Sequence, residues 1–193
     1  MRDKSLFLQK RRISKHLIWK KVKLGDIVFI QKGQQLNRST LKESGEYYVQ
    51  NGGVDPSGYT DKWNTKENTI TISEGGNSCG FVKLNKQKFW SGGHCYTLIN
   101  IDDKIERNFL YYYLKNNEQK IMRLRVGSGI PNIQKKDIEG FLIIYPDLKI
   151  QKEISDVLKY KEKEMETLQQ LSEKYEEQKK GLMQQLLIEK KRL

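Results

Sequence analysis

Residues 147–193 read DLKIQKEISDVLKYKEKEMETLQQLSEKYEEQKKGLMQQLLIEKKRL, and this stretch decides the architecture of the chain. It holds no proline, and its only glycine is Gly181. Its apolar residues recur in steps of three and four, which is typical of one face of an α-helix. They are Ile154, Leu158, Met165, Leu168, Tyr175, Leu182 and Leu186. Asp147 is the expected N-cap, because its carboxylate can accept the free N–H groups of the first turn.

An unbroken helix from 147 to 192 is about 69 Å long, at roughly 1.5 Å per residue. The preceding residues form too small a domain to cover that length, so we expect the apolar stripe to meet another helix. Lys161, Ser172 and Lys179 fall in the same column and weaken it. The alternative is a helix that folds back on its own domain.

Upstream of Pro146 the pattern is that of a β-rich domain. Short apolar runs are bounded by glycine pairs or turn residues, which predicts strands. The expected strands lie within 22–30, 47–50, 69–72, 80–84, 95–99 and 138–145, and a helix is expected over 109–124. The predicted fold class is α+β, a mixed β-rich domain with a few helices followed by one long C-terminal coiled-coil helix. The predicted parts are a basic arm (1–18), a DNA-binding domain (19–146) and the long helix (147–193).

The net charge of +12 is concentrated in the first three quarters of the chain. Residues 1–146 carry a net +11, whereas residues 147–193 carry a net +1. Positive charge of this size indicates a polyanionic partner, most often nucleic acid. Residues 4–25 contain eight basic residues and no acid, and form either a solvated arm or an arm that contacts phosphates.

Several classes of protein are disfavoured by what is missing. No apolar run approaches the roughly 18–20 residues that span a membrane. Two cysteines, Cys79 and Cys95, are too few for a disulfide framework, so a reduced, cytoplasmic protein is expected. No phosphate-binding Gly-x-x-x-x-Gly-Lys-Ser/Thr loop and no Asp/Asn-Pro-Pro-aromatic tetrapeptide occurs. Cys79, His94 and Cys95 lack the spacing of a metal site, so no metal ligands and no catalytic residues are predicted.

One enzymatic alternative stays open. Asp103 precedes Glu118-Gln119-Lys120, the order of residues in nucleases that hold Mg²⁺ between two carboxylates and activate water with a lysine. That chemistry favours a strand for the second motif, whereas here the motif falls inside the predicted helix.

The polar loops are the better candidates for function. Residues 31–40 form a polar loop, and amide and guanidinium groups of this kind can bond base edges. Residues 75–78 and 126–129 are glycine-rich, so their backbone N–H groups suit phosphates. Each loop alone is equally an ordinary polar turn. The candidate DNA-binding residues are Lys32, Gln34, Gln35, Asn37, Arg38, Asn51, Tyr59, Asn77, Ser78, Arg123, Arg125 and Ser128.

Six segments, taken in order, resemble the DNA-specificity subunit of type I restriction-modification systems. They are WKKVKLGDI (19–27), QNGGVDPSGYT (50–60), TISEGGNSCGFV (71–82), GSGIPNI (127–133) with the following Asp137-Ile138, IQKEI (150–154) and KGLMQQLL (180–187). The resemblance covers about residues 19–190. The usual family member has two recognition domains and two long helices, whereas this chain has one of each. It therefore resembles a half-subunit, either natural or a gene fragment.

The resemblance implies binding without chemistry. The recognition domain would read one half of a bipartite double-stranded DNA target. The helix would dock modification subunits, which carry S-adenosylmethionine and methylate adenine, and a restriction subunit would join for cleavage that uses ATP and Mg²⁺. The chain itself would bind no cofactor and contact no membrane. The helix would pair with a second copy or with another specificity chain.

Three readings remain at this point. The first is a specificity half-subunit, acting in methylation or regulating a full-length subunit. The second is a stand-alone nuclease that uses Asp103, Glu118 and Lys120. The third is a DNA-binding coiled-coil protein unrelated to restriction.

Overall fold

The computed structural model describes residues 18–127, 129 and 131–189. Most of the predicted basic arm lies outside the described residues, and so does the candidate Ser128. The chain divides into two compact units, residues 1–152 and 153–193. Across the described ranges, no helix is both long and apolar enough to cross a membrane.

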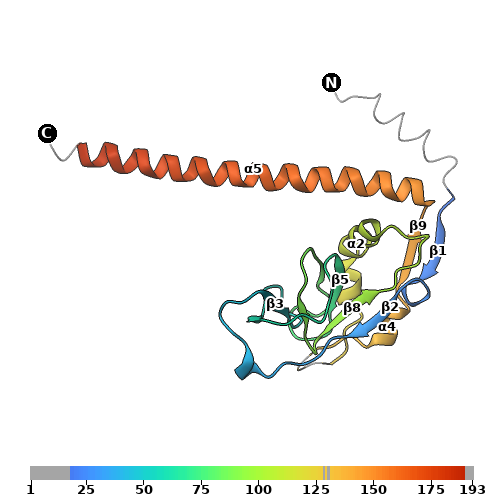
Figure 1. Ribbon diagram of the computed structural model, residues 1–193. Coiled ribbons are helices and arrows are strands. Elements are labelled where there is room, and N and C mark those ends of the chain that lie inside the picture. The colour runs from blue at the N-terminus through green and yellow to red at the C-terminus, as the bar shows by residue number, and fades with distance from the viewer. Residues whose placement is uncertain (1–17, 128, 130, 190–193) are drawn as a thin grey trace. The chain divides into compact units, whose positions relative to one another are not determined.

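A four-stranded antiparallel sheet is the centre of the first unit (Figure 1). Its order is β2 (Phe29–Lys32), β8 (Cys95–Ile99), β5 (Thr69–Ser73) and β6 (Val82–Asn85). The register pairs Lys32 with Tyr96 and Ser73 with Cys95. The end of β2, the start of β8 and the end of β5 therefore meet at one edge of the sheet.

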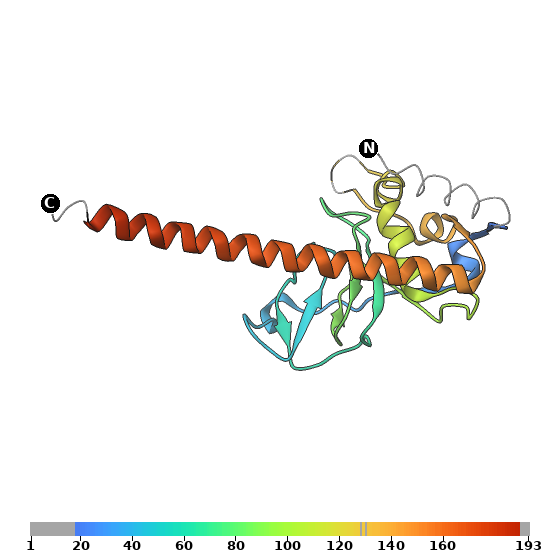
Figure 2. The same cartoon turned by 90° about the horizontal axis from the view of Figure 1, so that it is seen from above.

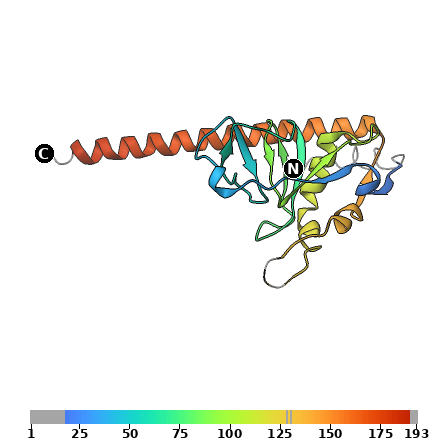
Figure 3. The ribbon, with the colours of Figure 1, turned by 60° about the horizontal axis from the view of Figure 1, so that its bottom comes forward.

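A smaller sheet lies beside the central one, as Figures 2 and 3 show. Its order is β4 (Tyr59–Thr60), β3 (Tyr47–Gln50) and β7 (Trp90–Ser91), with β3 and β7 parallel. Tyr48 stacks on the fully buried Phe89 at 5.5 Å between ring centroids and donates a hydrogen bond to Asn85 Oδ1 at 2.9 Å. Burial raises the pKa of Tyr48 to about 12, so this phenol stays a donor that ties β3 to β6.

The predicted strand over 138–145 is wrong in its first half. Residues Lys135–Glu139 form the short helix α4, and only β9 (Leu142–Tyr145) is a strand. β9 pairs with β1 (Lys20–Lys23). Directly after β1, the chain turns through the 3₁₀ segment η1 (Leu24–Asp26). A short apolar run does not distinguish a buried helix from a strand. Here the buried Ile138 belongs to a helical turn of α4.

The helix predicted over 109–124 is interrupted. α2 (Arg107–Asn116) and α3 (Glu118–Met122) are separated by Asn117. The Asn117 backbone, with a φ of −102° and a ψ of 12°, leaves the helical conformation, and its side chain donates to the Tyr113 carbonyl at 2.8 Å. The expected apolar positions Phe109, Leu110 and Leu114 are nevertheless buried.

The core of the first unit lies between the central sheet and these helices. α2 packs against β6, and apolar side chains from the sheet and both helices fill the space between them. The fully buried members are Ile30, Ile70, Ile72, Leu98, Leu110, Leu114 and Ile121. The edge of the central sheet where β2 and β5 end and β8 begins carries the candidate site.

The last element is α5 (Leu148–Glu189), an unbroken helix of 42 residues (Figure 1). Asp147 caps it as predicted, because its Oδ1 accepts the Ile150 N–H at 3.1 Å. In the first unit, the buried Gln151 side chain donates to the carbonyls of Lys104 and Pro146, each at 2.9 Å, and accepts the Glu106 N–H at 2.8 Å. The predicted α+β class and the long C-terminal helix are thus confirmed.

Most of the predicted stripe of α5 is exposed. Ile154 is half-buried and Leu158 is 37% exposed, while the members from Met165 to Leu186 are 58–70% exposed. Further apolar side chains that the stripe did not include are exposed as well, and they are Val157, Tyr160, Leu171, Met183 and Leu187. The pairing of this helix with another stays a prediction.

Candidate nucleic-acid interface

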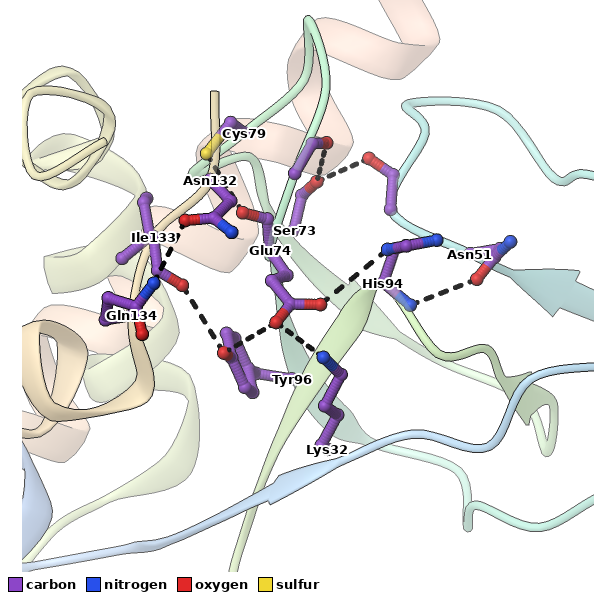
Figure 4. Close-up of polar contacts among 12 residues, drawn as sticks. Lys32, Asn51, Ser73, Glu74, Cys79, His94, Tyr96, Asn132, Ile133 and Gln134 are labelled. Atoms are coloured by element: carbon purple, nitrogen blue, oxygen red, sulfur yellow. Dashed lines mark hydrogen bonds and ion pairs between the residues drawn. The ribbon is translucent and has the colours of Figure 1, made fainter. Parts of the chain in front are cut away.

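A groove of about 480 Å³ lies at the edge where β2 and β5 end and β8 begins (Figure 4). Lys32 is the last residue of β2, Glu74 follows β5 and His94 precedes β8. The antiparallel register brings these three residues together although they are far apart in the sequence. The groove is lined by Lys32, Asn51, Gly52, Gly53, Glu74, Gly75, Gly76, Asn77, Ser78, His94 and Asn132.

Glu74 is the acidic residue of this groove, and its side chain is only 11% exposed. Its Oε1 accepts hydrogen bonds from Lys32 Nζ at 2.6 Å and from the Tyr96 hydroxyl at 2.9 Å (Figure 4). Its Oε2 faces His94 Nδ1 at 3.7 Å, which is beyond hydrogen-bond length. The Lys32 and His94 side chains are 53% and 63% exposed, so a buried anion is flanked by two basic groups that reach the solvent.

The Tyr96 side chain helps to fix the Glu74 carboxylate. The phenol is nearly fully buried, and its hydroxyl also lies 3.3 Å from the Ile133 carbonyl. Burial first, and then the hydrogen bond to Glu74, raise the pKa of Tyr96. The phenol therefore remains protonated and donates to Glu74 at physiological pH.

Close backbone contacts shape the wall beside His94. Asn51 Oδ1 accepts the His94 N–H at 3.2 Å. A Cβ added to Gly92 would lie 2.3 Å from this same Oδ1, and one added to Gly52 would lie 2.6 Å from the His94 carbonyl oxygen. Gly52 also has a φ of +88°, a conformation that side chains disfavour. Glycine at both positions lets the turn after β3 touch the turn before β8.

The two glycine-rich loops of the sequence lie next to each other. The Gly76 N–H donates to the Pro131 carbonyl at 3.0 Å, and Asn132 exchanges backbone hydrogen bonds with Val126 at 2.8 and 3.0 Å. Arg125 directly precedes Val126 and is exposed, as is Arg123 at the end of α3. Both arginines therefore precede Val126, which is hydrogen-bonded to Asn132 in the lining of the groove.

Four of the predicted DNA-binding residues line one groove: Lys32, Asn51, Asn77 and Ser78. Arg38 and Tyr59 line a separate, shallower hollow of about 500 Å³, together with Lys42. Lys42 forms an ion pair there with Asp61, and both side chains are more than half exposed. The predicted residues thus fall into at least two places on the surface of the first unit.

The remaining members of the 31–40 loop have local contacts. Asn37 Oδ1 accepts the Ser39 N–H at 3.1 Å and caps the 3₁₀ segment η2 (Arg38–Thr40). Gln35 Nε2 donates to the Leu36 carbonyl at 3.0 Å. The Gln34 side chain is exposed. The Gln34 backbone carbonyl accepts the Trp90 indole N–H at 2.8 Å. Gln34 also lines a third hollow of about 410 Å³ with Arg107 and Lys66.

Sequence reasoning missed Glu74 and Tyr96, and it weighed His94 only as a metal ligand, which the spacing from the cysteines disfavoured. Basic and amide side chains contact DNA most often, whereas a buried acid has no residue-type signal of DNA binding. A signal was present, because Glu74 stands between the alternating strand TITIS and the pair Gly75-Gly76.

The residues of the nuclease alternative have structural contacts instead. Glu118 Oε2 accepts the Val82 N–H at 2.8 Å and Lys115 Nζ at 2.6 Å. Lys120 Nζ donates to Asn117 Oδ1 at 2.9 Å, within the helical segment. Within the part of the chain that the structure describes, no group of three or more His, Cys, Asp or Glu side chains is placed to hold a metal ion.

Comparison with known proteins connects this domain to one family. The model of the type I restriction modification DNA specificity domain matches residues 18–177. A protein of Mycoplasma pneumoniae, named provisionally as a type I specificity subunit, is 34% identical over 166 residues. That alignment covers 85% of this chain and 44% of the relative. The specificity subunit of a type I restriction enzyme from Methanocaldococcus jannaschii is 29% identical over 123 residues, 62% of this chain and 28% of the relative.

The fold agrees with the same assignment. The crystal structure of a type I restriction-modification S subunit from M. genitalium superposes with a TM-score of 0.75 at 32% identity. The match covers 81% of this chain and 42% of that one, so the chain spans less than half the length of these relatives. Since the family model covers most of the chain, the protein belongs to the type I restriction-modification DNA specificity family.

Proposed function

We propose that this chain is a sequence-specific DNA-binding half-subunit of a type I restriction-modification complex. Residues 19–146 read one half of a bipartite target, with residues 1–18 as a basic arm on the phosphates. Residues 147–193 pair with a second specificity helix and dock the modification subunits. The family match across residues 18–177 is the observation that carries this proposal.

The groove supports the same proposal. It combines amide and hydroxyl side chains, which bond base edges, with the glycine-rich segment 75–78, whose backbone suits phosphates. The net +11 of residues 1–146 supplies the attraction for DNA that does not depend on sequence. The groove has the chemistry of recognition rather than of bond cleavage.

Catalysis belongs to the partners in this proposal. The chain itself binds no cofactor and holds no metal, while S-adenosylmethionine sits in the modification subunits and ATP with Mg²⁺ in the restriction subunit. We expect the complex in the cytoplasm with its double-stranded DNA target. The chain directs adenine methylation and restriction to a target and performs neither step.

The test is methylome sequencing of the source strain with and without the gene. A bipartite adenine-methylated motif that disappears with the gene supports the proposal, and an unchanged methylome contradicts it.

Two assays separate the alternatives. Plasmid cleavage by the purified chain with Mg²⁺, lost on Glu118→Ala, would establish the nuclease, and failure to co-purify with an adenine methyltransferase would favour an unrelated DNA-binding protein.

A further inference from the structure

The two oxygens of Glu74 have different surroundings. Oε1 accepts two hydrogen bonds, from Lys32 and Tyr96. Among the described residues Oε2 accepts none, since its contact to His94 Nδ1 measures 3.7 Å. Glu74 lines the groove, and its Oε2 thus has lone pairs that no hydrogen bond uses (Figure 4).

The backbone that carries this oxygen is held on both sides. The Glu74 N–H donates to the His94 carbonyl at 2.9 Å, and the Glu74 carbonyl accepts the Ile133 N–H at 2.8 Å and Cys79 Sγ at 3.1 Å. These contacts hold the Glu74 backbone in place, and the hydrogen bonds from Lys32 and the Tyr96 hydroxyl orient its carboxylate. A fixed group discriminates between ligands better than a mobile one, because it cannot move away from a mismatched partner.

A carboxylate on a DNA-binding surface must not repel the phosphates. Here Lys32 pairs with Glu74 directly, and the His94 ring stands on the other side. The side chains around the groove therefore carry no net negative charge. The amide and hydroxyl groups of Asn51, Asn77 and Ser78 are neutral, so the groove can face DNA while retaining one strong acceptor.

The chemistry of base edges selects the partner of that acceptor. In the major groove, cytosine N4 and adenine N6 are amino donors, whereas guanine O6 and N7 and thymine O4 are acceptors. An ionised carboxylate accepts hydrogen bonds and donates none, so it bonds an amino group and repels the oxygens of guanine and thymine. We propose that Glu74 Oε2 accepts a hydrogen bond from the exocyclic amino group of one base in the half-site, which makes Glu74 a specificity-determining residue. This inference rests on the proposed function.

The experiment is selection of bound duplexes from a random-sequence pool by the full chain, followed by sequencing. The wild type is compared with Glu74→Gln, which adds a donor at the same place, and with Glu74→Asp, which keeps the charge but withdraws it by one methylene. Asp61→Asn is the matched control, since it removes one negative charge from a lysine pair that does not line the groove. Thermal melting of each variant shows that it is folded.

The wild type is expected to demand cytosine or adenine at one position, and the base selected there tells the two amino donors apart. Glu74→Gln should admit guanine or thymine at that position, changing the ratio of amino to keto bases at least about tenfold, with the other positions unchanged. Glu74→Asp should keep the amino base with a weaker preference, and Asp61→Asn should keep the wild-type motif. For a Glu74→Gln protein that does not fold, the weakened preference for the amino base in Glu74→Asp is the deciding result.

Other results overturn the inference. An identical motif in all folded variants means that Glu74 reads no base. A uniform loss of affinity in Glu74→Gln, with the motif unchanged, means that Glu74 only positions Lys32. A wild-type chain with no sequence preference contradicts the proposed function itself, and the inference with it. The failure of the inference alone is therefore distinguishable from the failure of the function.

Discussion

The Asn51 side chain accepts a hydrogen bond from the backbone N–H of His94, 43 residues away in the sequence. This bond joins the turn after β3 to the turn before β8, and the wall of the groove depends on it. It forms because Gly52 and Gly92 carry no side chain at the crossing point. The groove is thus built by long-range backbone contacts as much as by its functional side chains.

We predict that Gly52→Ala damages the groove more than Gly76→Ala does. Both glycines have a positive φ, +88° and +75°, so alanine costs about 1 kcal/mol of strain at either position. At Gly52 the new Cβ would also lie 2.6 Å from the His94 carbonyl oxygen, while at Gly76 nothing lies within 4 Å. Urea unfolding should show a loss of about 2–3 kcal/mol for Gly52→Ala and about 1 kcal/mol for Gly76→Ala. Equal losses of unfolding free energy in the two variants would show that the contact between Gly52 and the His94 carbonyl is not tight.

Binding of DNA should be sensitive to salt and should depend on residues 1–146. A protein that neutralises Z phosphates shows a log–log salt slope of about −0.9Z. Lys32→Ala removes a positive charge and the ion pair that it forms with Glu74, so we expect weaker binding to every sequence alike. Fluorescence anisotropy on two unrelated duplexes over a salt series measures this, and a loss confined to one duplex would contradict it.

Arg38 and Gln35 should affect the preferred sequence rather than affinity in general. Both side chains are exposed in the loop after β2. Their replacement by alanine should change base preference by about 1–3 kcal/mol at the affected position, the usual value of a good base contact. Lys42→Ala, in the same hollow as Arg38, is a matched charge control. If selection returns the wild-type motif for both alanine variants, the predicted recognition loop is misplaced.

The free energy of unfolding should fall as the pH rises from about 9 to about 11. Burial raises the pKa of Cys95 from 9.0 to about 11, so the folded chain keeps this proton where the unfolded chain loses it. Since the folded state binds more protons in that window, stability decreases with rising pH. Urea titrations at several pH values should show a smaller decrease for Cys95→Ala. Parallel curves for the two proteins would mean that the thiol does not contribute.

Local sequence patterns predicted the elements of this fold better than their boundaries. The strand at 69–72 and the Asp147 cap follow from periodicity and from side-chain hydrogen bonding, both of which act within a few residues. The run 138–145 failed because hydrophobicity alone does not separate the buried turn at Ile138 from the strand that begins at Leu142. The break at Asn117 leaves no mark on the apolar periodicity, because the buried Leu114 and Ile121 lie on either side of it.

The candidate site was predicted only in part, for a different reason. Lys32, Asn51, Asn77 and Ser78 were identified by residue type, but nothing local indicated that they share one groove. Their proximity comes from the pairing of β2, β8 and β5, which is a property of long-range register. Glu74 cannot be identified by residue type, because the different partners of its two oxygens are a feature of the folded structure.

Assembly through α5 is the last prediction, and it starts from exposure. Leu168, Tyr175 and Leu182 are 58–62% exposed on one face of the helix. Burying one such leucine stabilises by roughly 1.5–3 kcal/mol, so covering the stripe strongly favours a partner. We expect a second copy, paired antiparallel about a two-fold axis. Lys161, Ser172 and Lys179 make that pairing imperfect, so modification subunits should strengthen it.

Two identical readers related by a two-fold axis require a palindromic, interrupted target, with the helix pair as the spacer. Lengthening α5 by whole turns should therefore lengthen the gap and leave the half-sites unchanged.

Leu168→Asp with Leu182→Asp should give monomers in sedimentation and abolish binding to the bipartite site. Gln170→Asp with Gln184→Asp is the matched control, because it adds the same charge at the same 14-residue spacing on the opposite face. An asymmetric methylated motif would contradict the homodimer, because two identical readers select identical half-sites, and it would identify the partner as a different specificity chain.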